Sequence, residues 1–125
     1  MKIVTLSLLF AVSMLSANES KINLECYPYQ FMVGGKVTRE LTKENAQASG
    51  LTNTISYNSK DMKLQNASTI INLAHVDTQK EGDIPVEIYK DVNSNIMCKI
   101  NPKDISSLAM DWGNRVIINY KCEVK

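Results

Sequence analysis

The chain has 125 residues, of which 44% are hydrophobic, and 14 lysines and arginines against 13 aspartates and glutamates give a formal net charge of +1. A nearly neutral chain lacks the broad positive field that attracts nucleic acid or an anionic membrane surface, so we expect neither as a partner. The length predicts one ordinary domain that can bury a hydrophobic core without metal ions or many disulfides.

Residues 1–17 have the pattern of a secretory signal peptide. Lys2 gives a positive start, residues 3–15 are almost wholly apolar, and small residues follow up to Ala17. The apolar run is shorter than the about 20 residues that a helix needs to cross a bilayer. We therefore predict cleavage after Ala17, a soluble mature domain of residues 18–125 without a membrane span, and a periplasmic or secreted location.

Most of the mature chain alternates apolar and polar residues with a period of two, which is typical of strands with one buried face. Gly34-Gly35 predicts a hairpin turn, because glycine readily adopts positive φ. The segment 68–76 is apolar on both sides and is the candidate for a central strand. The strands expected are 22–29, 31–33, 36–38, 53–57, 62–64, 68–76, 84–89, 96–100 and 115–123.

A first short helix is predicted over residues 41–49. Thr42 would cap its amino end, and Gly50 would supply the left-handed residue that ends it. Its composition is polar, so we expect it on the surface.

The segment 102–112 allows two interpretations. Asn101-Pro102 has helix-start chemistry, and four apolar residues follow at helical spacing, namely Ile105, Leu108, Ala109 and Trp112. The alternative makes 108–110 a strand and 111–114 a hairpin loop. We favour the helix and keep the strand open. Together these elements predict a single mainly-β domain, either an antiparallel β-sandwich or a partly open β-barrel, with about seven or eight strands and one or two short helices.

The three cysteines, Cys26, Cys98 and Cys122, all fall on the apolar side of their strands by alternation. The chain has no CxxC motif, so zinc and thioredoxin-like sites lack support. In an oxidising compartment two cysteines should pair. We favour Cys26–Cys122, which would join the first strand to the last, and keep Cys98–Cys122 as the alternative. The remaining thiol is expected to be buried and inert.

The sequence offers little support for catalysis. Its one histidine, His75, stands two residues before Asp77, so the two should share a strand face. A Cys–His–Asp set with an unpaired thiol is formally available, but a hydrogen-bonded strand histidine is the favoured interpretation. Motifs for a nucleophilic serine, a phosphate loop or a calcium loop are not present. We predict no catalytic residues, no cofactor and no metal site.

Tyr27, Tyr29 and Phe31 alternate along one strand, on the face opposite to Cys26. With Trp112 they form the candidate interaction surface, because exposed aromatic side chains dominate binding energy at protein interfaces. A bulge near Pro28 would shift the alternation and turn the aromatics inward, and the inward position is favoured for all four residues.

The functional hypothesis is an exported, non-enzymatic protein-binding module of a bacterial envelope, of inhibitor or immunity type or part of an envelope assembly. Its partner would be another extracytoplasmic protein, and the sequence leaves its oligomeric state open. One alternative is a small-molecule or lipid carrier, which needs an apolar cavity. The other is a small thiol–histidine enzyme, which needs His75 in a cleft beside a reactive thiol.

Overall fold

The computed structural model of the protein describes residues 20–125. The predicted signal peptide, residues 1–17, and its cleavage point after Ala17 lie outside the described residues. No helix in the described part is both long and apolar enough to cross a membrane.

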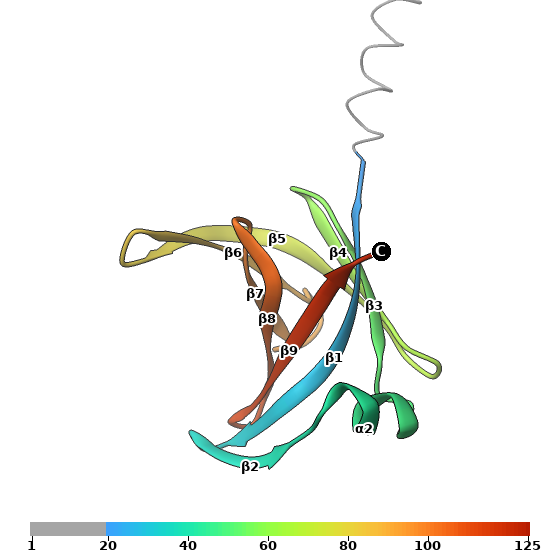
Figure 1. Cartoon of the computed structure of the whole chain (residues 1–125). Coiled ribbons are helices and arrows are strands. Elements are labelled where there is room, and N and C mark those ends of the chain that lie inside the picture. The colour runs from blue at the N-terminus through green and yellow to red at the C-terminus, as the bar shows by residue number, and fades with distance from the viewer. Residues whose placement is uncertain (1–19) are drawn as a thin grey trace, which may run out of the picture.

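Within residues 20–125 the chain forms nine strands and one short helix, shown in Figure 1. Their bounds are β1 Ile22–Val33, β2 Lys36–Glu40, α2 Lys43–Ala48, β3 Asn53–Tyr57, β4 Asp61–Gln65, β5 Ile70–Glu81, β6 Ile84–Lys90, β7 Met97–Asn101, β8 Asp104–Gly113 and β9 Val116–Val124.

Every strand except β2 belongs to a closed antiparallel barrel. From β3 to β9 each strand pairs with the next along the chain, and β1 closes the barrel by pairing with β3 on one side and β9 on the other. The extra strand β2 pairs with the second half of β1. The prediction of a mainly-β domain with a barrel as one of its forms is confirmed, and the barrel is closed, which removes free sheet edges from its wall.

Local chemistry explains the first turn and the helix. Gly34 and Gly35 adopt φ values of 60° and 80°, which form the tight turn between β1 and β2. The Thr42 side chain accepts a hydrogen bond from the backbone of Asn45 at 3.1 Å and so caps α2, and Gly50 follows the helix with a φ of 68°. The sequence predictions of this hairpin and this helix are confirmed.

The helix predicted over residues 102–112 is wrong, because nearly all of this segment lies in strand β8, and the strand kept as the alternative is the observed element. β8 has a partner on each side, β7 and β9, so its backbone is hydrogen-bonded along both edges of the barrel wall. Asn101 and Asp104 accept bonds from the backbones of Lys103 and Ser106, at 2.9 and 3.2 Å, and form turns where a helix start was expected.

The strand predicted at 68–76 is longer than expected and is not a central strand. β5 continues to Glu81, and beyond the barrel it pairs only with β6, so the two strands form a projecting hairpin, drawn in yellow in Figure 1. In a closed barrel every strand has two neighbours, so no strand is more central than another. Ile70, at 55% exposure, and Val76, at 52%, lie on the outer side of β5.

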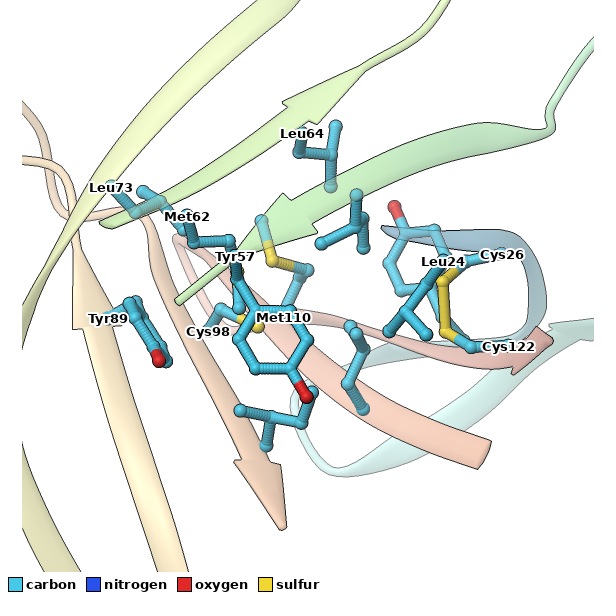
Figure 2. Packing of buried hydrophobic residues seen from close by; sticks show 14 of the residues in the cluster. Leu24, Cys26, Tyr57, Met62, Leu64, Leu73, Tyr89, Cys98, Met110 and Cys122 are labelled. Carbon is cyan, nitrogen blue, oxygen red and sulfur yellow. A yellow bond between two sulfur atoms is a disulfide. The ribbon is translucent and has the colours of Figure 1, made fainter. Parts of the chain in front are cut away.

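Side chains fill the barrel interior. Figure 2 shows the buried cluster, in which Leu24, Met62 and Met110 are at most 1% exposed. All three cysteines face this interior, as the alternation predicted. The buried cluster consists of Leu24, Cys26, Ile55, Tyr57, Met62, Leu64, Ile71, Leu73, Tyr89, Cys98, Ile100, Leu108, Met110, Tyr120 and Cys122.

Candidate functional site: the outer surface beside the disulfide

The seam between β1 and β9 carries a disulfide. Cys26 and Cys122 stand directly opposite each other in the ladder, 4.1 Å apart at Cα, and their sulfurs are bonded. This is the pairing that the sequence favoured. Figure 2 shows the bond in yellow, apart from the third cysteine, Cys98, which is free and buried opposite Met110 on β8.

A β-bulge in the same seam separates the predicted aromatic surface into two parts. Tyr27 is paired with exposed Lys121 on the outer face, but the register shifts between Pro28 and Gln30. After the shift Phe31 stands opposite Ile118, which packs against the core cluster. The expectation that Phe31 shares a face with the two tyrosines is therefore wrong.

The two tyrosines stay on the outer face of the wall, so the inward position favoured for them is wrong. The ammonium group of Lys121 lies 4.8 Å from the ring centroid of Tyr29, within the range of a cation–π contact. Phe31 instead lies beneath the guanidinium of Arg39 at 5.9 Å. Trp112 packs against the core cluster with its indole Nε1 buried, which is the inward position.

Beside the disulfide the outer face forms a groove of about 480 Å³, which we call the disulfide groove. Its floor is the seam of β1 and β9, and its walls are α2 on one side and the start of β8 on the other. In Figure 1 α2 lies beside the lower part of β1. The charged and aromatic side chains that line this groove are Glu25, Tyr27, Lys43, Lys121 and Glu123.

Of the two glutamates in the disulfide groove, Glu123 forms an ion pair with a lysine and Glu25 does not. Glu25 and Glu123 face each other directly across the ladder. Lys43, from the first turn of α2, donates a hydrogen bond to Glu123 Oε1 at 2.8 Å. This hydrogen bond, together with the negative charges of Glu123 and Glu25, raises the pKa of Lys43.

A second hollow, which we call the outer groove, continues from Tyr29 across the outer face of β8 and β7. Two adjoining depressions of about 240 and 290 Å³ share Lys99, Ala109 and Asn119. Ser107 borders both this groove and the disulfide groove, so the two adjoin at this residue. The apolar side chains along the outer groove are Tyr29, Met32, Val86, Met97, Ala109 and Ile117.

Two polar contacts shape the outer groove. Asn119 donates from Nδ2 to Gln30 Oε1 at 2.9 Å, which fixes its amide at the floor. Glu81, near the tip of the projecting hairpin, lies 3.9 Å from the ammonium group of Lys99. The hairpin therefore reaches back toward the outer face of β7.

His75 lies outside this surface, and its partner is not Asp77. The register of β5 against β6 shifts between His75 and Asp77, so Asp77 turns to the opposite face. His75 Nε2 instead bonds to the Glu87 carboxylate, which also accepts a hydrogen bond from Thr78 Oγ1 at 3.0 Å. The expectation that His75 and Asp77 share a face is wrong, because a single extra residue reverses the alternation.

The free thiol is poorly suited to nucleophilic chemistry. Cys98 and His75 stand in one row of the ladder, but Tyr89 lies between them. Desolvation raises the pKa of Cys98 from its ordinary value of 9.0 to about 12, so the reactive thiolate is strongly disfavoured.

The polar half of this surface was not predicted from the sequence. Glu25, Lys121 and Glu123 occupy the outward positions of β1 and β9, and the alternation contained that information. The approach of Lys43 from α2 depends on how the helix packs against β1, for which the sequence carried no signal. Over residues 20–125 no three or more His, Cys, Asp or Glu side chains are grouped so that they could hold a metal ion.

Comparison of this chain with protein-family models, with curated proteins and with solved structures finds no match.

Proposed function

We propose that the chain is an exported, non-enzymatic protein-binding module that engages its partner through the outer surface around Tyr27 and Tyr29. One observation carries the proposal: a β-bulge holds Tyr29 on the outside of the barrel, where it lines one of two adjoining grooves. The partner class is another extracytoplasmic protein, either a target of inhibition or immunity or a component of an envelope assembly.

The chemistry of this surface supports protein recognition. Tyrosine is a rigid anchor with an apolar ring and a polar tip, and it is enriched where binding energy concentrates. Met32 and Met97 lie in the adjoining groove. Methionine is flexible and polarisable, so it adapts to apolar side chains of a partner. The disulfide supports an oxidising compartment, in agreement with a periplasmic or secreted location.

The two alternatives receive less support. A carrier needs an apolar cavity, but the residues of the buried cluster are 0–8% exposed and occupy the interior where a barrel would hold its ligand. A thiol–histidine enzyme needs a reactive thiol, and burial of Cys98 opposes one.

The test compares two aromatic residues of the same strand. The domain of residues 18–125, with its disulfide intact, serves as bait against envelope and culture extracts of its own organism. We expect one stoichiometric protein partner. Tyr29→Ala should abolish capture and leave the thermal midpoint nearly unchanged, because the ring lies on the outer face.

Phe31→Ala is the matched control, since it removes a similar ring from the opposite face of β1. We expect it to lower the thermal midpoint and to retain capture below that temperature. Capture that survives Tyr29→Ala, or loss of fold in that variant, would contradict the proposal.

A further inference from the structure

We draw no further inference here: the strongest candidate, the outer edge of β5 from Val76 to Glu81, is exposed along the projecting hairpin and pairs within the described chain only with β6, but nothing in the structure shows what covers its free side.

Discussion

The position of Cys98 in the barrel wall determines how its thiol behaves. It is fully buried, it stands opposite Tyr89 on one side and Met110 on the other, and burial raises its pKa to about 12. Only the thiolate attacks an alkylating reagent, and the reagent must also reach the sulfur. Both conditions fail in the folded barrel.

We therefore predict that iodoacetamide at pH 8 does not modify the native protein. In denaturant without a reducing agent the same reagent should add one carbamidomethyl group, because Cys26 and Cys122 remain bonded. Intact mass measurement gives the number of groups. Three additions after reduction provide the control, and rapid modification of the native protein would show that Cys98 is accessible.

Alternation predicts the direction of a side chain only as far as the next β-bulge, and two bulges, in the β1–β9 and β5–β6 ladders, limit the prediction of the site. Strict alternation places all three cysteines inside and Tyr27 outside, as the structure has them, but the inward position favoured for Tyr27 is wrong. Alternation failed for Phe31 and Asp77, which each follow a shift of register. A bulge inserts one extra residue and reverses every later side chain. Pro28 suggested a bulge in the first strand, but the sequence did not fix the residue after which the side chains turn.

At the scale of elements, the β1–β9 seam matters most for the barrel, because it joins the beginning of the described chain to its end. The ladder runs from Leu24 opposite Val124 to Val33 opposite Val116, and the Cys26–Cys122 bond fixes its register. The two cysteines are 96 residues apart in sequence. A crosslink over a loop of this size removes much conformational freedom from the unfolded chain.

We predict that breaking this bond lowers the free energy of unfolding by about 4–5 kcal/mol in the chain-entropy model. The measurement is urea unfolding of the oxidised wild-type domain against the Cys26→Ala/Cys122→Ala variant. Cys98→Ala is the control, since it removes a buried sulfur without opening the loop. A double variant as stable as the wild type would mean that the paired strands alone hold the seam.

Strand β8 shows why element type was harder to predict than fold class. Ile105, Leu108, Ala109 and Trp112 fit a helical stripe, but Leu108, Met110 and Trp112 also fit a strand with a period of two. Periodicity alone cannot choose between them in a short segment. The choice is made by β7 and β9, which pair with both edges of β8 through short hairpin turns, and the periodicity of the segment does not contain that pairing.

At the scale of the whole molecule, the closed barrel buries groups that ionise only in alkali. Burial raises the pKa of Cys98 to about 12, and burial is also the main cause that raises the pKa of Tyr120, with the negative charge of an ionised Cys98 adding to it. In the unfolded chain these groups ionise near their ordinary values of 9.0 and 10.0. Between the unfolded and folded pKa values, the folded barrel therefore holds more protons than the unfolded chain.

Stability falls with rising pH wherever the folded state binds more protons. We predict that the free energy of unfolding begins to decline above about pH 9, by up to about 1.4 kcal/mol per pH unit for each of these protons. Urea unfolding from pH 7 to pH 11 measures the slope.

Cys98→Ala removes the group that ionises first. The free energy of unfolding of this variant, relative to its own value at pH 7, should therefore fall less between pH 9 and pH 10 than that of the wild type. Tyr120→Phe should keep the decline that Cys98 causes from pH 9 upward and lose only the additional slope above about pH 10. Equal slopes in all three proteins would show that the buried thiol and phenol do not control alkaline unfolding, and that exposed groups do.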